Sequence, residues 1–252
     1  YMIILENAEK RKISAAVFDF DGTLSTLRCG WEQVMEPMMV EMICGETEPT
    51  EELRREVAAY IDESTGIQTI HQMKWLAKTA CERGLNPEAT EDPWFNMDNN
   101  SANIVRVQEE LKSQEDRSGG IAAQMEQVQQ RLDKLEKGEE QPEKYLMKGS
   151  LEFLKTLHDQ CVKLYVASGT DHADVVREAT ALGVAKYFTT IYGAQHGSEG
   201  CSKEAIIESL LKGLPGESLA VIGDGKVEIR LGREAGARTI GIASDEEKLC
   251  GI

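Results

Sequence analysis

Two aspartates stand two positions apart in the segment Asp19-Phe20-Asp21-Gly22-Thr23-Leu24. The four residues before them, 15–18, are all apolar, as expected of a buried strand. Side chains at positions i and i+2 of a continuing strand share a face, so the two carboxylates would lie together at the end of this strand. Open α/β sheets bind ligands at that end. An Asp-Gly pair is also a common turn dipeptide, so two solvated acids in a turn are the simpler alternative.

Three further segments place polar groups near predicted strand ends. The segment Ala167-Ser168-Gly169-Thr170-Asp171 combines a hydroxyl, a glycine and a helix start, which suits a phosphate, although Ser-Gly before a helix is also an ordinary turn. The segment Gly223-Asp224-Gly225-Lys226-Val227-Glu228 adds two acids, which would equally stabilise a helix N-terminus. Lys203 begins another predicted helix, where a lysine is normally solvated.

Taken together, these side chains indicate phosphoryl transfer. They offer a nucleophile, a second acid, a hydroxyl and a cation. A phosphate ester is anionic and repels a carboxylate nucleophile, so the attack needs a hard cation held by other carboxylates. Mg²⁺ prefers such oxygen ligands, and it is the cofactor we expect.

The elements that must position these groups alternate between strands and helices. The predicted strands are 13–18, 162–167, 187–192, 219–222 and 239–243. The predicted helices are 150–160, 172–183, 202–213 and 227–236. This alternation predicts an α/β fold, a Rossmann-like doubly wound parallel sheet that carries the chemical groups at its carboxyl edge.

A long insertion separates the first predicted strand from the others. Residues 28–147 contain 25 acidic and 13 basic residues, a balance of −12, and their apolar residues recur at helical spacing. We therefore predict two domains, a catalytic core made of 1–27 and 148–252 and an all-helical domain made of 28–147. The latter includes a Gln- and Glu-rich helical segment, 104–137. The pair Gly119-Gly120 should interrupt this segment, either between two antiparallel helices or at a bend in one long helix.

Composition excludes several classes of function. The 252-residue chain has 44 acidic and 28 basic residues, and its formal net charge of −16 would repel nucleic acids and anionic membranes. The longest apolar run, 1–5, is far shorter than the roughly 20 residues of a transmembrane helix. The six cysteines are scattered, as is typical of reduced thiols. We therefore expect a soluble cytoplasmic protein that binds neither nucleic acid nor membrane.

The segments DFDGTL, ASGT, SKE and GDGKVE, in this order, resemble the four motifs of the haloacid dehalogenase superfamily of phosphohydrolases. The resemblance implies that Asp19 is the nucleophile that forms an aspartyl-phosphate. It implies that Asp21 protonates the leaving oxygen and then activates water. A Mg²⁺ site would be made by Asp19, the backbone carbonyl of Asp21, Asp224 and Glu228. Whether Glu228 binds the metal directly or through water stays open.

The same resemblance implies a phosphate-binding set. Ser168 and Lys203 would hold the phosphoryl oxygens, and backbone N–H groups near Phe20, Asp21 and Gly169 would assist them. The acid at Asp21 argues against the dehalogenase and phosphonate-cleaving branches, which lack it.

The insertion resembles the helical cap that such proteins close over the active site, which favours small phosphorylated metabolites as substrates. Thr65 and Gln68, in a polar break, would contact the leaving group, unless this break is an ordinary turn with Thr69 as a helix cap. Arg28 and Trp31 would line the entrance to the site, although Trp31 equally fits an anchor for the cap hinge.

The resulting hypothesis is a Mg²⁺-dependent phosphatase of small phosphate monoesters, such as sugar phosphates. A phosphomutase, which passes the phosphoryl group to a second substrate hydroxyl, would use the same motifs. A non-catalytic alternative treats the apolar positions between 104 and 135 as a partner-binding coiled coil on an idle core. The sequence leaves the oligomeric state open between a monomer and a homodimer.

Overall fold

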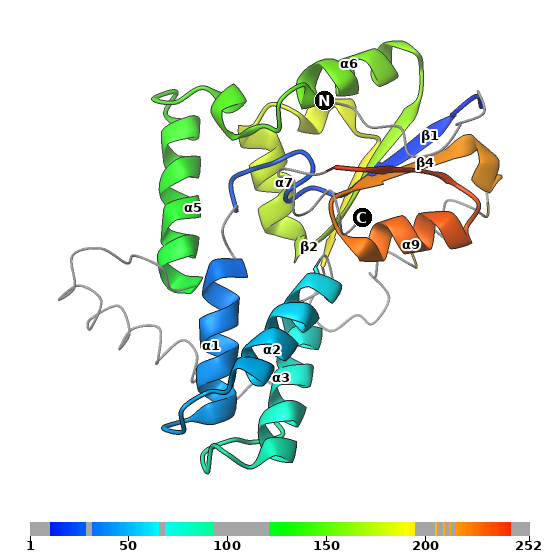
Figure 1. The fold of residues 1–252 in the computed structure, drawn as a ribbon. Helices are drawn as coiled ribbons and strands as arrows, with labels where there is room; N and C mark the ends of the chain where they lie inside the picture. The colour runs from blue at the N-terminus through cyan, green and yellow to red at the C-terminus, as the bar shows by residue number, and fades with distance from the viewer. Residues whose placement is uncertain are drawn as a thin grey trace.

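The core is a five-stranded parallel sheet with the strand order β3-β2-β1-β4-β5 (Figure 1). The computed structural model describes residues 11–28, 32–65, 69–92, 121–194 and 215–242, together with 205, 209 and 212. The strands are β1 (Ala15–Phe18), β2 (Lys163–Asp171), β3 (Thr190–Ala194), β4 (Leu219–Gly223) and β5 (Arg238–Gly241). This sheet confirms the predicted α/β fold class.

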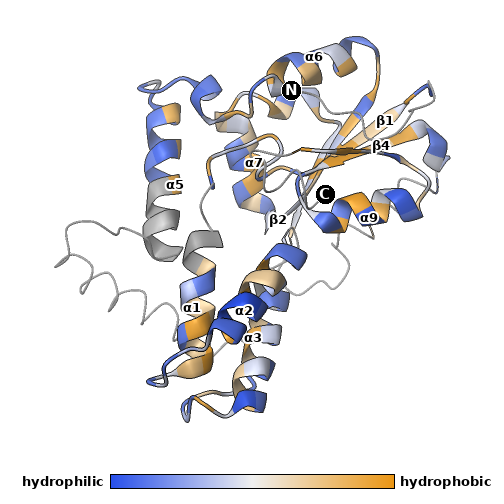
Figure 2. Ribbon diagram, viewed as in Figure 1, coloured by the Kyte–Doolittle hydropathy of each residue, from blue (hydrophilic) through white to orange (hydrophobic). Residues whose placement is uncertain are grey.

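Apolar residues of β1 face both sides of the sheet, which explains why helices cover both. Alternate side chains of a strand point to opposite faces. Ala16 and Phe18 belong to the apolar cluster under α6 (Ser150–Asp159) and α7 (His172–Ala181). Ala15 and Val17 belong to the cluster under α9 (Lys226–Glu234). Figure 2 shows the strands as a hydrophobic layer between helices with hydrophilic outer faces.

The predicted boundaries agree with the observed ones to within a few residues. The largest differences are at β2, which continues to Asp171, and at β3, which begins at Thr190 because Tyr187 ends the short 3-10 helix η2 (Ala185–Tyr187). Gly183 and Gly236 follow α7 and α9 with φ of 69° and 72°, the left-handed conformation that ends a helix. Most of the predicted helix 202–213 lies outside the described residues, although 205 and 209 are helical. Two further 3-10 turns are η1 (Pro142–Tyr145) and η3 (Gly216–Ser218).

Three helices form a separate helical unit below the sheet in Figure 1. They are α1 (Glu32–Cys44), α2 (Glu51–Glu63) and α3 (Thr69–Arg83). They share an apolar cluster of their own, in which Met39, Val57 and Leu76 are fully buried. A second centre of burial indicates a second packing unit.

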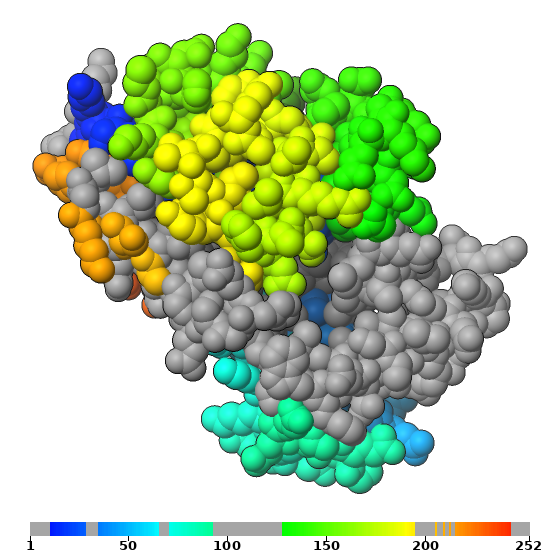
Figure 3. All heavy atoms as spheres, turned by 180° about the vertical axis from the view of Figure 1, so that it is seen from behind, coloured from blue at the N-terminus to red at the C-terminus, as the bar shows by residue number. Residues whose placement is uncertain are grey.

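Helix α5 (Ile121–Glu136) packs on the core instead. Its side chains Val128, Leu132 and Leu135 belong to the same apolar cluster as α6 and α7. Arg177 of α7 forms an ion pair with Glu136 at 2.8 Å. Figure 3 shows the green residues of α5 beside the yellow-green residues of α7. The division of the chain at residues 28 and 147 stays a prediction, and 104–120 lie outside the described residues.

The first connection from the core to the α1–α3 unit lies beside the chain segment that follows α5. The N–H of Thr26 donates to the carbonyl of Tyr145, and the N–H of Met147 donates to the carbonyl of Leu24, both at 2.9 Å. Arg131 of α5 also donates to a carbonyl of the first connection, that of Leu27. In the part of the chain that the structure describes, no helix is both long and apolar enough to cross a bilayer.

Candidate active site

Asp19 and Asp21 lie at the carboxyl end of β1 but have different surroundings. Asp19 follows the last strand residue and is 7% exposed. Its N–H donates to the carbonyl of Ile222 in β4 at 2.8 Å, so it continues beside that strand. The chain then turns, because two later backbone N–H groups both donate to the carbonyl of Phe20. Asp21 lies within this turn.

Three carboxylates gather around the end of β1. Asp19, Asp224 and Glu228 each offer an oxygen, and these oxygens lie within 4.8 Å of one another. The hydroxyl of Thr23 donates to Oδ1 of Asp224 at 2.9 Å. The N–H of Gly225 donates to Oε1 of Glu228 at 2.6 Å, so this buried carboxylate caps α9 while it faces the other two.

Two glycines make room for this cluster. A Cβ at Gly22 would lie 2.1 Å from Oδ2 of Asp224, and one at Gly223 would lie 2.2 Å from Cγ of Glu228. Both positions therefore need glycine as long as the acids stay in place. Oxygen ligands alone, confined in this way, fit a hard divalent cation such as Mg²⁺.

Asp21 is held by the C-terminal end of β2 rather than by the acid cluster. The hydroxyl of Thr170 donates to its Oδ2 at 2.8 Å, and the hydroxyl of Ser168 lies 3.5 Å from the same atom. The N–H of Thr170 in turn donates to the Ser168 hydroxyl at 3.0 Å. The register of β1 and β2 thus brings the predicted acid and the predicted phosphate-binding hydroxyl together.

Arg28 lies on the other side of Asp21. Its Nε is 4.0 Å from Oδ1 of Asp21, and its Nη2 is 3.6 Å from a carboxylate oxygen of Asp174. Nε and Nη2 both donate to Oε1 of Glu178 in α7, at 2.9 and 2.5 Å. Glu178 is completely buried, and this burial raises its pKa to about 7, although the Arg28 guanidinium opposes the rise.

The α1–α3 unit contacts the core beside the acid cluster. Lys226, inside the GDGKVE segment, forms an ion pair with Asp62 of α2 at 2.5 Å. A Cβ at Gly225 would lie 2.9 Å from the backbone carbonyl of Thr65. The Thr65 hydroxyl donates to the carbonyl of Ile61 at 2.9 Å, so it supports the end of its own helix.

The structure brings most of the predicted site residues to one edge of the sheet. Asp19, Asp21, Ser168, Asp224 and Glu228 all lie there, with the completely buried Phe20 inside the turn and Gly169 next to Ser168 in β2. Lys203 and Gln68, as well as Trp31, lie outside the described residues.

Sequence reasoning missed three side chains at the site: Thr23 and Thr170, which bind its acids, and Glu178, which binds Arg28. Thr23 lies in the DFDGTL motif and Thr170 in the ASGT motif, but the sequence alone assigned neither side chain a role. Glu178 carried no local signal, because it stands 150 positions from its partner Arg28.

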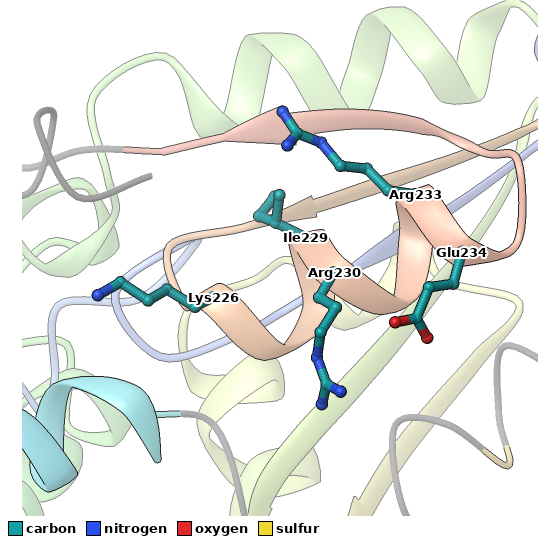
Figure 4. Close-up of a pocket in the computed structure, with 5 residues that line it drawn as sticks. All are labelled: Lys226, Ile229, Arg230, Arg233 and Glu234. Carbon is teal, nitrogen blue, oxygen red and sulfur yellow. The ribbon is translucent and has the colours of Figure 1, made fainter.

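A shallow depression along the outer face of α9 is separate from this site (Figure 4). Its lining residues are Lys226, Ile229, Arg230, Arg233 and Glu234. None of the three clustered carboxylates lines it, so it is not part of the candidate site.

A family model described as a haloacid dehalogenase-like hydrolase matches residues 13–236. A comparison with curated proteins found no match.

Solved structures with the same fold are distant in sequence. A β-phosphoglucomutase from Clostridium difficile has 13% identity and a TM-score of 0.57, with 94% of this chain and 87% of that chain covered. A predicted phosphatase from Clostridium acetobutylicum has 13% identity and a TM-score of 0.52, with 95% and 90% covered. A haloacid dehalogenase-like family protein from Streptococcus pneumoniae has 18% identity and a TM-score of 0.50, with 95% and 90% covered. At such identities these likenesses concern the fold.

Proposed function

Because the chain belongs to the haloacid dehalogenase-like hydrolases, we propose that it is a Mg²⁺-dependent phosphatase that hydrolyses a small phosphate monoester through an aspartyl-phosphate. The observation that carries this proposal is the division of labour between the two aspartates. Asp19 lies with two other carboxylates, whereas Asp21 is held apart by Thr170. Two carboxyl groups in different environments suit a nucleophile and a general acid.

In the first step, a carboxylate oxygen of Asp19 bonds to phosphorus while the bond from phosphorus to the leaving oxygen breaks. The leaving oxygen takes the proton of Asp21, so an alcohol departs rather than an alkoxide. Ser168 and Lys203 would hold the phosphoryl oxygens, together with N–H groups near Phe20 and Gly169.

In the second step, Asp21 is a carboxylate and accepts a proton from water. The water oxygen bonds to phosphorus, and the bond between phosphorus and Asp19 breaks, which releases phosphate and restores the free carboxylate. Asp19, the backbone carbonyl of Asp21, Asp224 and Glu228 would hold Mg²⁺. When bound, the cation supplies the positive charge that lets an anionic ester approach these acids.

The contacts of the α1–α3 unit support a small substrate. Lys226 and Asp62 connect this unit to the core beside Asp224, and the Thr65 carbonyl lies against Gly225. A phosphoprotein or a nucleic acid would have to pass this covering unit, which favours a small phosphorylated metabolite as the substrate.

Helix α5 argues against the non-catalytic coiled-coil alternative. Its apolar positions Val128, Leu132 and Leu135 are already buried against the core. In the described part of the segment, these apolar side chains therefore pack against the core of the same chain and are not available to a partner.

The test is hydrolysis of 4-nitrophenyl phosphate by the purified protein. We expect phosphate release with Mg²⁺, loss of release with EDTA, and at least a 100-fold lower rate for Asp19→Asn. Asp159→Asn is the matched control, because Asp159 is an exposed aspartate at the end of α6, before the amino end of β2, whereas the site lies at the carboxyl ends of the strands. This variant should keep wild-type activity. Full activity of Asp19→Asn would contradict the nucleophile, and a requirement for a bisphosphorylated activator would indicate a phosphomutase. A panel of phosphorylated metabolites would then identify the substrate.

A further inference from the structure

The buried pair of Arg28 and Glu178 has no role in the mechanism above. Glu178 is 0% exposed, and one of its oxygens, Oε1, accepts both hydrogen bonds from Arg28. Glutamate is almost never fully buried unless it is paired. An ion pair in this position is weak evidence for stability, because removing two charges from water offsets most of their attraction. The pair therefore invites a functional explanation.

The position of Arg28 suggests a function for the pair. The residue stands at the start of the first connection to the α1–α3 unit, and Glu178 fixes its guanidinium against α7. The fixed guanidinium faces Oδ1 of Asp21 at 4.0 Å. With Asp174 also 3.6 Å away, the guanidinium lies among three carboxylates. Its charge is thus already matched by groups of this chain.

Asp21 consequently has partners on two sides. The Thr170 hydroxyl donates a hydrogen bond to Oδ2, and the Arg28 guanidinium lies 4.0 Å from Oδ1, at ion-pair rather than hydrogen-bond distance. The terminal torsion of an aspartate side chain has a broad, nearly two-fold preference, so the carboxyl plane needs partners to fix it. A general acid must point its proton at the leaving oxygen, and small errors of orientation reduce rates strongly.

We propose that Arg28, anchored by Glu178, is a positioning residue that orients the carboxyl group of Asp21 for proton transfer to the leaving oxygen. This inference rests on the proposed function, because it assumes that Asp21 is the general acid. In this proposal Arg28 acts through Asp21.

The consequence is a dependence on the leaving group. Phenyl phosphate and 4-nitrophenyl phosphate have similar shapes, but phenolate is the poorer leaving group and needs the proton more. The ratio kcat/KM reports the steps up to departure of this group. We expect Arg28→Ala to lower kcat/KM about tenfold for phenyl phosphate and less than about threefold for 4-nitrophenyl phosphate. Arg131→Ala is the matched control, because Arg131 binds the same connection at Leu27, and it should change both substrates equally.

A double-mutant cycle separates positioning from a general structural effect. If Arg28 acts through Asp21, Asp21→Asn with Arg28→Ala should have the same kcat/KM as Asp21→Asn alone, within about twofold. Because Arg28→Ala leaves Glu178 buried without its partner, the pair Arg28→Met with Glu178→Met serves as a second variant that removes both charges. This pair should show the same dependence on the leaving group.

The outcomes are distinguishable. Equal losses for the two substrates, or additive losses in the cycle, would overturn the positioning role while Asp21 remains the acid. A wild-type protein that hydrolyses neither substrate with Mg²⁺ would overturn the proposed function and this inference together.

Discussion

Gly22→Ala tests whether the turn after β1 is built around Asp224. Gly22 has a φ of 76°, and a Cβ there would lie 2.1 Å from Oδ2 and 2.7 Å from Cγ of Asp224. These distances are too short for any real contact, so the Asp224 carboxylate or the turn must move. The carboxylate is not free to rotate away, because the Thr23 hydroxyl donates to its Oδ1 at 2.9 Å.

The expected loss of stability in Gly22→Ala has two parts. Alanine in the left-handed region costs about 1–2 kcal/mol whatever surrounds it. Displacing Asp224 adds the loss of a hydrogen bond to a charged acceptor, about 1.5–3 kcal/mol. We therefore expect a total loss of about 2.5–5 kcal/mol in the free energy of unfolding. This loss corresponds to a Tm roughly 5–20 °C lower for a chain of this size.

Gly138→Ala is the matched control. Gly138 has a φ of 71°, and a Cβ there would meet nothing within 4 Å. This variant should lose only the backbone part, about 1–2 kcal/mol. The difference between the two variants therefore isolates the contact with Asp224.

Urea unfolding with and without Mg²⁺ measures both parts. A ligand at 100 times its Kd stabilises the folded state by about 2.7 kcal/mol, so wild type and Gly138→Ala should gain about this much from saturating Mg²⁺. Gly22→Ala should gain little, because its Asp224 is displaced. The close contact between position 22 and Asp224 would be refuted if the two variants had unfolding free energies within about 0.5 kcal/mol of each other and Gly22→Ala kept the full stabilisation by Mg²⁺.

Three further perturbations address the packing and the buried charges. Leu76→Ala should lower the unfolding free energy of the α1–α3 unit by about 2–5 kcal/mol, because Leu76 is fully buried there, and calorimetry should show an earlier transition that leaves the core transition in place. Lys226→Met should cost less than about 1 kcal/mol at low salt and nothing at high salt, because its ion pair with Asp62 is largely exposed; a salt-independent loss in urea unfolding would contradict this. The pKa of Glu178, raised to about 7 in the folded state, means that folding binds a proton between about pH 4.5 and 7, so stability from this group falls as pH rises through that window. Relative to Glu178→Gln, wild type should lose on the order of 3 kcal/mol between pH 4 and 8, and a constant difference in urea unfolding across this range would count against the raised pKa.

The sheet and the place of the acids were predictable because both follow from local pattern and handedness. Alternating apolar runs and helical stretches predict parallel strands, and parallel strands bring their carboxyl ends to one edge. Since β1 pairs with β2 on one side and β4 on the other, Asp19, Ser168 and Asp224 had to be neighbours.

Other features could not be predicted from local pattern. The apolar spacing of Val128, Leu132 and Leu135 indicates a helix with one buried face, but spacing does not say which surface covers that face, and the core does. The pairing of Arg28 with Glu178 joins residues 150 positions apart. The spacing of apolar residues along the sequence does not predict such a contact, because the contact depends on where α7 packs.

The negative charges of the acid cluster explain why we expect activity to require a bound cation rather than dissolved salt. Two unit charges 4.8 Å apart repel each other by about 3–4 kcal/mol at an effective dielectric constant near 20, and the oxygens of Asp19, Asp224 and Glu228 lie within that distance. Arg28 does not offset them, since Glu178, Asp21 and Asp174 surround it. The screening length at physiological salt is about 8 Å, longer than the separation of these oxygens, so monovalent ions leave the local repulsion of a phosphate largely intact. A divalent ion held by the acids themselves offsets two of their three negative charges. Chelation by EDTA is therefore a sharper test of the mechanism than a change of ionic strength.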